Sequence, residues 1–198
     1  MTLATPPKVS PYTPADVDRL SDLHGRLYEL LHGELVEKVV SAEANLIAGQ
    51  ITTRLNGAYP GWQAYVFPEQ PTYCFADPKH GRRPDVSLVW RDRLPQGVSD
   101  AELFVVPDLV VEVVSPSNIY DDIRERVDEF LEVGTPLIWI VEPARRSIQM
   151  YRNDGTVALL RASDTLANEP ALPGFSMRVG DIFPPPPAPP APLAPPQP

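Results

Sequence analysis

The 198-residue sequence contains a single cysteine, Cys74, so no disulfide bond can form within the chain. No segment approaches the roughly 20 consecutive apolar residues that a membrane-spanning helix needs. Residues 1–12 lack the apolar core of a secretory signal peptide. These absences argue against a disulfide-stabilised secreted scaffold and a membrane protein, and we expect a cytoplasmic protein with a free, buried thiol.

Positive charge is scarce, with 17 Lys and Arg residues against 26 Asp and Glu residues, and a formal net charge of -9. Such a surface does not attract phosphates in general, so contact with nucleic acid has to be local or bridged by metal ions. The sign reverses at residues 79–83 (Lys-His-Gly-Arg-Arg), just before Asp85, and again at Arg91 and Arg93. This cluster either directs phosphate to a site or is an ordinary surface loop.

Several catalytic motifs are missing. The sequence has no Gly-rich phosphate-binding loop, no nucleophile elbow and no His-Glu-x-x-His helix. The three histidines, His24, His32 and His80, do not have the spacing of zinc ligands. A serine hydrolase or a zinc enzyme is therefore excluded as the leading interpretation.

The chain divides into three parts: a weakly ordered N-terminus at 1–11, one domain at 12–183, and a Pro-rich disordered tail at 184–198. The tail contains ten prolines and no charged residue, a composition that favours polyproline II and cannot build a packed core. It either binds an aromatic groove of a partner protein or is a passive end of the chain.

The spacing of apolar residues predicts the elements of the first half of the domain. We expect a helix capped by Thr13 or Asp16 and running to Leu27, and a strand segment at 28–40 that turns at Gly33. A second helix is predicted at 42–58. Short strands are expected at 62–66, 71–75 and 85–90.

The pattern of apolar residues in the second half of the domain predicts a parallel pair of strands. Residues 109–114 are apolar except for Glu112, without the alternation of a half-exposed strand, so this strand should be central. A helix at 121–133, ended by Gly134, and strands at 137–141 and 148–152 follow. Strand, helix and strand in this order predict a βαβ crossover and an α/β fold.

Glu112 is the most informative residue because a carboxylate within a buried strand is costly unless it is paired, protonated or bound to a metal. Strand alternation places Asp108 on the same face, where it either joins the site or is a turn residue after Pro107. Asp85, at the start of its own strand, is the second candidate. Two carboxylates on neighbouring strands suit Mg²⁺ or Mn²⁺, and a buried salt bridge from Asp85 to an arginine is the alternative.

Arg126 lies at the edge of the apolar face of the helix at 121–133, from where its long side chain could reach the Glu112 strand. There it could stabilise charge that develops on a phosphate, although it cannot act as a general base. The alternative is a solvated helix edge where Arg126 pairs with Asp122 or Glu129.

Four segments, taken in order, resemble the Uma family of restriction endonuclease-like proteins, within the PD-(D/E)XK nuclease superfamily. They are residues 28–35 (Tyr-Glu-Leu-Leu-His-Gly-Glu-Leu), 83–86 (Arg-Pro-Asp-Val), 107–118 (from Pro-Asp-Leu to Pro-Ser-Asn) and 134–143 (from Gly-Thr-Pro to Val-Glu-Pro). The resemblance extends from about Tyr28 to about Phe183.

The resemblance implies an α/β (α+β) fold with a restriction-endonuclease-like mixed sheet and flanking helices. It implies that Asp85 and Glu112 hold Mg²⁺ or Mn²⁺ and that the substrate is DNA. Glu34 matches another acidic position of the family, and it either contributes to the metal site or is an exposed strand residue.

The sequence also departs from the family pattern. Val114 stands where the superfamily has its lysine, and Arg126 stands where this family commonly has a lysine on the following helix. Ala44 or Asn45 replaces the histidine that many relatives carry on the early helix.

Two functions follow. The retained carboxylates favour a divalent-metal-dependent endonuclease that hydrolyses DNA phosphodiester bonds, most simply as a twofold homodimer when both strands are cut. The departures favour a catalytically degenerate nuclease-fold protein that acts as a binding or assembly module.

Overall fold

The computed structural model describes residues 12–98, 102–115 and 120–185. The expected weak order of residues 1–11 and all of the Pro-rich tail after Pro185 lie outside the described residues. Within the described ranges, no helix combines the length and the apolar composition that crossing a membrane requires.

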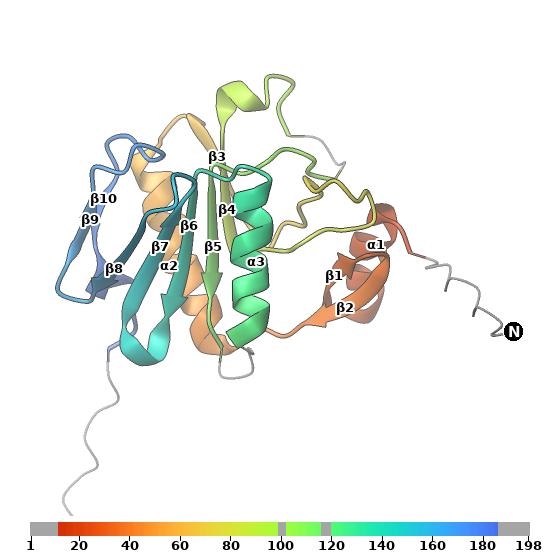
Figure 1. Ribbon diagram of the computed structural model, residues 1–198, viewed down its shortest axis with the longest axis horizontal. Helices are drawn as coiled ribbons and strands as arrows, with labels where there is room; N and C mark the ends of the chain where they lie inside the picture. The colour runs from red at the N-terminus through yellow and green to blue at the C-terminus, as the bar shows by residue number, and fades with distance from the viewer. Residues whose placement is uncertain (1–11, 99–101, 116–119, 186–198) are drawn as a thin grey trace, which may run out of the picture.

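A six-stranded mixed sheet forms the centre of the domain, in the order β3-β4-β5-β6-β7-β8 (Figure 1). Only β5 and β6 run parallel, and the helix α3 connects them, which confirms the predicted βαβ crossover. All five residues of β5 are buried, as expected for a central strand. The bounds are β3 Ala64–Pro68, β4 Val86–Trp90, β5 Leu109–Val113, α3 Tyr120–Glu132, β6 Leu137–Glu142, β7 Ser147–Arg152 and β8 Val157–Arg161.

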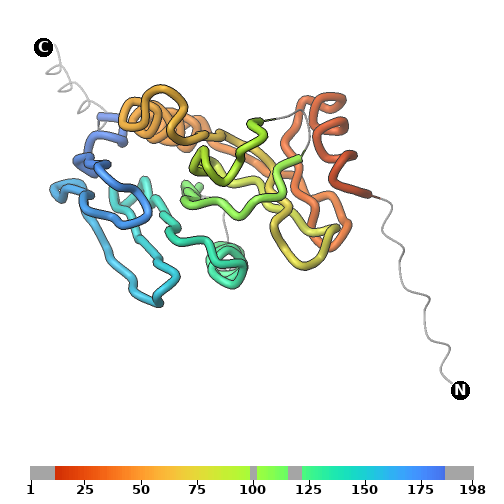
Figure 2. Tube along the Cα trace, turned by 90° about the horizontal axis from the view of Figure 1, so that it is seen from above, coloured from red at the N-terminus to blue at the C-terminus, as the bar shows by residue number. Residues whose placement is uncertain are grey.

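Helices cover both faces of this sheet (Figure 2). On one face α2 (Ala42–Ala58) packs its buried residues Ile47, Ile51 and Leu55 into the larger core. The C-terminal elements β9 (Thr165–Ala167), β10 (Ser176–Arg178) and the 3-10 helix η3 (Val179–Ile182) contribute to the same core. On the other face, Val127 and Phe130 of α3 pack against Val110 and Ile138. The expected mixed sheet with flanking helices is confirmed.

The N-terminal helix α1 (Pro14–His24) and the hairpin of β1 (Leu27–Leu31) and β2 (Glu34–Lys38) form a separate small layer beside the sheet (Figure 1). The hairpin turns at His32 and Gly33, both with positive φ, so the turn predicted at Gly33 is present. Leu30 and Gly81 exchange two backbone hydrogen bonds, which fix the hairpin against the loop before β4. This attachment brings β1 and β2 close to the first residues of β4.

Some expected elements differ from the structure. The first helix ends at His24 because Gly25 adopts a left-handed C-cap (φ 63°), and Leu27 already belongs to β1. Residues 71–75 form no named strand, since the backbone of Thr72 pairs only through isolated bridges with Arg82 and Leu103. The sequence analysis also missed β8, β9 and β10. Two further 3-10 helices lie at η1 (Arg91–Arg93) and η2 (Pro143–Arg145).

Candidate active site

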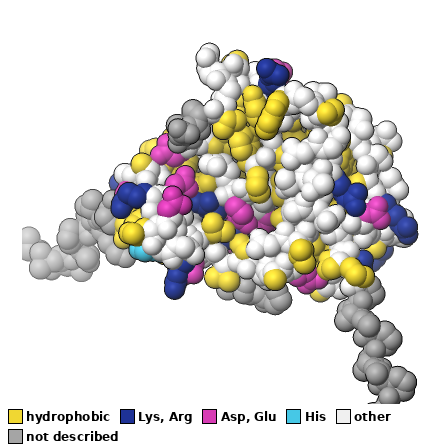
Figure 3. Space-filling model, turned by 180° about the vertical axis from the view of Figure 1, so that it is seen from behind, with side chains coloured by type: hydrophobic (Ala, Val, Ile, Leu, Met, Phe, Trp, Pro, Cys, Tyr) yellow, Lys and Arg dark blue, Asp and Glu magenta, His cyan; other side chains and the backbone are white. Residues whose placement is uncertain are grey.

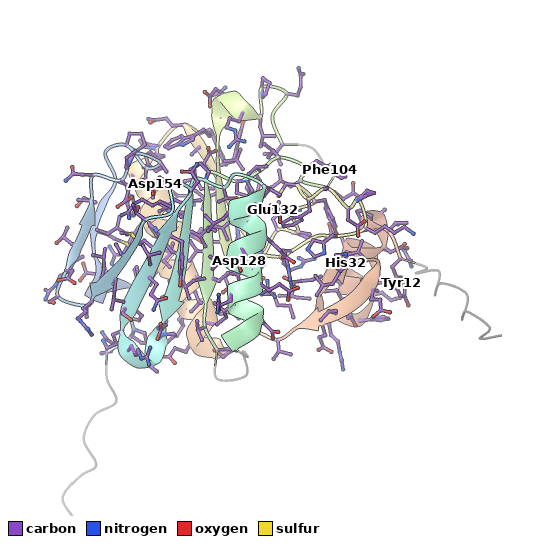
Figure 4. The ribbon with its side chains drawn as sticks, in the orientation of Figure 1. Tyr12, His32, Phe104, Asp128, Glu132 and Asp154 are labelled. Atoms are coloured by element: carbon purple, nitrogen blue, oxygen red, sulfur yellow. The ribbon has the colours of Figure 1, made fainter. Side chains whose placement is uncertain are left out.

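Side chains from the hairpin, from two central strands and from α3 line a pocket of about 280 Å³. The pocket lies where β4 begins and the antiparallel β5 ends, between α3 and the hairpin (Figure 4, where Asp128 marks α3 and His32 the hairpin turn). Its charged lining includes three buried carboxylates and two cations, which are Glu29, Asp85, Glu112, Lys38 and Arg126.

Asp85 is held in place through both of its carboxylate oxygens. The residue precedes β4 and is 3% exposed. Its Oδ2 atom accepts a hydrogen bond from the backbone N–H of Val113 at 2.5 Å, and its Oδ1 atom accepts one from Lys38 Nζ at 2.6 Å. Charge-assisted bonds of this kind are short and strong. They fix the Asp85 carboxylate directly beside the end of the Glu112 strand.

Glu112 is buried but only weakly neutralised. Its closest cation is Arg126, whose NH1 atom lies 3.3 Å from Glu112 Oε1. Burial raises the pKa of Glu112 to about 7 because the attraction of Arg126 and Lys38 does not offset the loss of hydration, and Asp85 and Glu29 add repulsion. Near neutral pH this carboxylate therefore gains from any further positive charge in the pocket.

Lys38, the last residue of β2, enters the same pocket and had not been predicted. Its Nζ atom donates to Asp85 Oδ1 at 2.6 Å, to Glu69 Oε2 at 2.8 Å and to the backbone oxygen of Arg83 at 2.6 Å. Burial alone would lower the pKa of Lys38, but the surrounding carboxylates, first Asp85 and then Glu112 and Glu69, outweigh it and raise the pKa. Lys38 is an ammonium ion with all three of its N–H groups engaged.

Arg126 connects α3 to the hairpin. Its two terminal nitrogens donate to the two oxygens of Glu29, both at 2.7 Å, in a bidentate pair. Burial would raise the pKa of Glu29, but the charges of Arg126 and Arg82 and a hydrogen bond from the Arg83 backbone hold it below its usual value. The pair fixes the guanidinium at the pocket wall, where it also faces Glu112.

Glu69 is the second carboxylate that contacts Lys38. Its Oε2 atom accepts the Lys38 bond, while Oε1 is buried without a hydrogen-bond partner among the described residues. Burial raises the pKa of Glu69 to about 7 in spite of Lys38, and the nearby Asp85 carboxylate adds to the rise. Lys38 is thus shared by the carboxylates of Asp85 and Glu69. Glu69 is not fully neutralised by Lys38, and Glu112 is not fully neutralised by Arg126.

Comparison with known proteins identifies the family of this chain. The model of the Uma2 family, described as "Putative restriction endonuclease", matches residues 14–180. The chain is a member of the Uma2 family. A crystal structure of a "putative nuclease belonging to DUF820" from Anabaena variabilis shares the fold, with a TM-score of 0.72 at 20% identity, covering 87% of this chain and 98% of that one. No curated protein matches the chain.

The two carboxylates that the family resemblance had singled out lie in one pocket of this Uma2 protein. Asp85 and Glu112 come from neighbouring antiparallel strands, and Arg126 reaches Glu112 from α3 as its helical position had indicated. Neither Asp122 nor Glu129 pairs with Arg126, because Glu29 of the hairpin takes both of its terminal nitrogens.

Glu34 lies elsewhere. It is exposed at the first position of β2, opposite Leu31, and is not part of the pocket lining. Strand geometry explains the difference, because Lys38, at the far end of the same strand, is the residue that reaches Asp85. No group of three or more acidic, His or Cys side chains suited to a metal occurs in the described parts of the chain.

Asp108 also stays outside the pocket. It is buried at the opposite end of β5 from Glu112, where Oδ2 accepts from the backbone N–H of Trp90 at 3.0 Å and Oδ1 from Arg93 NH1 at 2.7 Å. Asp108 therefore fixes the end of β4 and the start of η1. Of the two alternatives for Asp108, the structure supports a residue outside the Glu112 site, because the length of the strand separates them.

The basic segment before Asp85 is not a phosphate-binding loop. Arg82 and Arg83 are 3% and 5% exposed. Arg82 pairs with Glu129 of α3 at 2.6 Å, and Arg83 donates to the backbone oxygens of Tyr28 and Glu69. Their charges hold the loop, the hairpin and α3 together.

Sequence reasoning missed Lys38, Glu29 and Glu69 for a common reason. Each becomes part of the site through packing between segments 31 to 97 residues apart. Of the three, only Glu29 had a feature in the nearby sequence that could have identified it. It lies in the family-like segment 28–35, next to Leu30, and both residues are buried. Nothing in the sequence around Lys38 distinguishes it from an exposed strand residue.

Proposed function

We propose that this Uma2 protein is a divalent-metal-dependent endonuclease that hydrolyses phosphodiester bonds of DNA. The observation that supports the proposal most strongly is the placement of Asp85 and Glu112 in one pocket together with a buried ammonium, Lys38, and a guanidinium, Arg126. Carboxylates of this kind suit a hard cation, and the cations suit a phosphate.

The residues of the pocket fit a divalent ion. Glu112 is buried with a pKa raised to about 7, so a cation beside it relieves a charge that Arg126 neutralises only partly. Mg²⁺ keeps several water ligands and is commonly held by one or two carboxylates, so Asp85 and Glu112 suffice as protein ligands. Mn²⁺ takes the same donors.

The chain's own residues have distinct roles in this proposal. A divalent ion supplies a Lewis acid that favours ionisation of water and stabilises charge on the phosphoryl group. Lys38 has no N–H left for a substrate, so it is a positioning residue that orients the Asp85 carboxylate. Arg126 faces the pocket beside Glu112, and it is the guanidinium available to stabilise negative charge on a bound phosphate.

One observation favours the alternative of a non-catalytic binding or assembly module. Both terminal nitrogens of Arg126 are already engaged by Glu29 at 2.7 Å, so the guanidinium stabilises the fold whether or not a substrate binds. A degenerate nuclease that kept this ion pair for structural reasons would show the same geometry.

Incubation of the purified protein with supercoiled plasmid and Mn²⁺ or Mg²⁺, with and without a chelator, separates the two functions. We expect nicking or linearisation that requires the metal and is lost in Asp85→Asn. Asp108→Asn is the matched control, because Asp108 is equally buried but lies outside the pocket. Absence of cleavage by the wild type with both ions would reject the nuclease.

Calorimetric titration with Mn²⁺ tests the metal site independently of activity. Asp85→Ala should lose most of the affinity that the wild type shows, whereas Asp108→Ala should keep it. Equal binding by the wild type and Asp85→Ala would contradict a metal site in this pocket.

The apparent mass of the protein in light scattering, with and without DNA, tests the proposed homodimer.

A further inference from the structure

Three aromatic side chains form a continuous row along the outer strand of the sheet. Trp62 precedes β3, and Tyr65 and Phe67 lie within it. The ring centroids are 6.2 Å apart between Trp62 and Tyr65 and 6.2 Å apart between Tyr65 and Phe67. We call these three residues the aromatic edge, because β3 pairs only with β4 in the six-stranded sheet.

The aromatic edge is exposed at Trp62 and half-buried at Tyr65 and Phe67. Trp62 is 69% exposed, while the other two tryptophans are buried or half-buried. Its backbone has φ 61°, a left-handed conformation unfavourable for a bulky residue, directly after Gly61 with φ 69°. Such conformations persist where surrounding structure enforces them, and here the result is an outward-facing indole.

A groove of about 550 Å³ runs along these rings. Its lining is Trp62, Tyr65, Val66, Phe67, Arg91 and Val98, so a single residue of the described lining is charged. Figure 3, the view from behind that of Figure 1, shows hydrophobic side chains gathered in the upper half of that face of the molecule. Exposed apolar surface beside an open strand edge is a site that a partner segment usually covers.

The chain carries a segment whose sequence suits such a groove. From Pro186 the sequence reads Pro-Pro-Ala, Pro-Pro-Ala, Pro-Leu-Ala, Pro-Pro-Gln, Pro, so proline recurs at every third position from 186 to 198. Polyproline II has three residues per turn, so this period aligns five prolines on one ridge and three alanines and a glutamine on another. Proline ridges of this geometry bind aromatic-lined grooves.

The segment is long enough to reach the aromatic edge of its own domain. Its thirteen residues span about 40 Å as polyproline II, whereas α2, which runs beside the route, is about 25 Å long. The start of the route lies between α2 and the β6–β7 connection, because Arg54 donates to the backbone oxygen of Asp181 at 3.0 Å and Arg146 donates to that of Pro184 at 2.7 Å. Trp62 lies only eight residues after Arg54 in the sequence.

We propose that residues 186–198 cross beside α2 and dock their C-terminal part, as polyproline II, on the aromatic edge of the same molecule. The segment carries no charge and the groove is lined almost entirely by apolar and aromatic side chains, so the two surfaces match in chemistry. A nucleic acid strand would need cations along the groove, and Arg91 is the one that its described lining supplies. The docking covers the open edge of β3, and it does not depend on the proposed nuclease activity.

A peptide of residues 184–198 added to a protein that ends at Pro185 tests this proposal. The peptide contains no aromatic residue, so tryptophan emission reports only on the domain. We expect saturable binding with a blue shift. In calorimetric titration, which does not depend on the fluorophore, we expect an affinity at least about tenfold lower for Trp62→Ala, since a central aromatic contact is removed. Leu23→Ala is the matched control, because Leu23 is also 69% exposed but lies on α1.

Two further measurements make the test specific. A peptide with alanine at positions 186, 189, 192 and 195 should bind at least about tenfold more weakly, and the full chain should resist added peptide because its own segment occupies the groove. Equal binding by the alanine peptide or by Trp62→Ala would overturn the proposal. So would a lack of peptide binding combined with quenching of Trp62 by a single-stranded oligodeoxynucleotide.

Discussion

At the scale of single residues, the site is a set of buried charges that are unequally satisfied. Asp85 has a partner on each oxygen, whereas Glu112 has one long contact, at 3.3 Å from Arg126. Incomplete neutralisation of a buried carboxylate lowers the stability of the fold, and it is the condition under which a bound cation is most favourable. The pocket therefore lowers the stability of the metal-free fold and at the same time favours binding of a cation.

Replacing Glu112 with glutamine should stabilise the metal-free protein above neutral pH. The folded-state pKa of about 7 lies above the ordinary glutamate value of 4.5, so the folded protein binds more protons between these values and stability falls as pH rises through that window. At pH 8 we expect Glu112→Gln to raise the free energy of unfolding by about 1–3 kcal/mol. Near pH 4 the difference should vanish.

Urea denaturation at pH 4, 6 and 8, with a chelator present, measures this effect. Glu34→Gln is the control, because Glu34 is exposed and should change little at any of these pH values. A Glu112→Gln protein that is less stable than the wild type at pH 8 would mean that the ionised carboxylate stabilises the fold.

Replacing Lys38 with methionine should destabilise the protein strongly. Methionine keeps most of the side-chain volume but leaves Asp85 and Glu69 without their shared ammonium, and loss of one partner of a buried pair typically costs about 3–5 kcal/mol. The double variant Lys38→Met with Glu69→Gln should recover part of that loss. Thermal unfolding at pH 8 compares the three proteins, and a Lys38→Met melting temperature equal to that of the wild type would contradict the buried geometry.

At the scale of elements, ion pairs attach the hairpin and α3 to the sheet. Glu29 of β1 binds Arg126 of α3, and Arg82 of the preceding loop binds Glu129 of the same helix. The hairpin contributes Leu30 to a small core of its own, with Val17 and Tyr73. The relative position of these elements, and hence the shape of the pocket, depends on these charged contacts as well as on apolar packing.

Substitutions of Arg126 separate its structural role from its proposed catalytic one. Arg126→Ala leaves Glu29 buried without its bidentate partner, so we expect a loss of about 3–5 kcal/mol in stability together with loss of cleavage. Arg126→Lys keeps a positive charge and supplies the lysine that the family resemblance implies at this position, so it should retain cleavage or increase it, with a smaller loss of stability. Denaturation and plasmid assays at a temperature where all variants stay folded give the two readouts.

The outcomes for Arg126 are distinguishable. Unchanged cleavage in Arg126→Ala would limit this residue to the ion pair with Glu29. No cleavage by the wild type or by Arg126→Lys with several metals would favour the non-catalytic module.

At the scale of the whole molecule, one sheet separates two unlike surfaces. The charged pocket lies at one end of β4 and β5, and the aromatic edge extends along β3 toward the other end, where Ala64 pairs with Trp90. The Pro-rich segment begins after Phe183, which is buried and stacks with Arg146. The hydrophobic core of the domain is thus complete before the Pro-rich segment starts.

Deleting residues 186–198 should leave the fold intact. Ile182 and Phe183 already complete the core, and a proline-rich segment supplies few backbone N–H groups for hydrogen bonds. Melting temperatures of the full and truncated chains should agree within a few degrees, by scanning calorimetry. A fall of ten degrees or more would show that the segment is part of the folded core rather than a docked peptide.

The sequence by itself determined the central part of this protein. The unbroken apolar run of β5 predicted a buried strand, the helix and apolar strand after it predicted the parallel crossover, and the family-like segments identified Asp85 and Glu112. These features are local, because strand burial and helix periodicity are written in consecutive residues.

The tertiary structure alone decided which charges meet. Lys38 reaches Asp85 across 47 residues and Arg126 reaches Glu29 across 97, and no local pattern encodes such pairings. It also buried Arg82 and Arg83, whose sequence cluster was compatible with either a phosphate-directing site or an ordinary surface loop. A side chain's charge is fixed by its chemistry, but its partner and its hydration are fixed by the packing of distant segments, and the function of this pocket depends on those two properties.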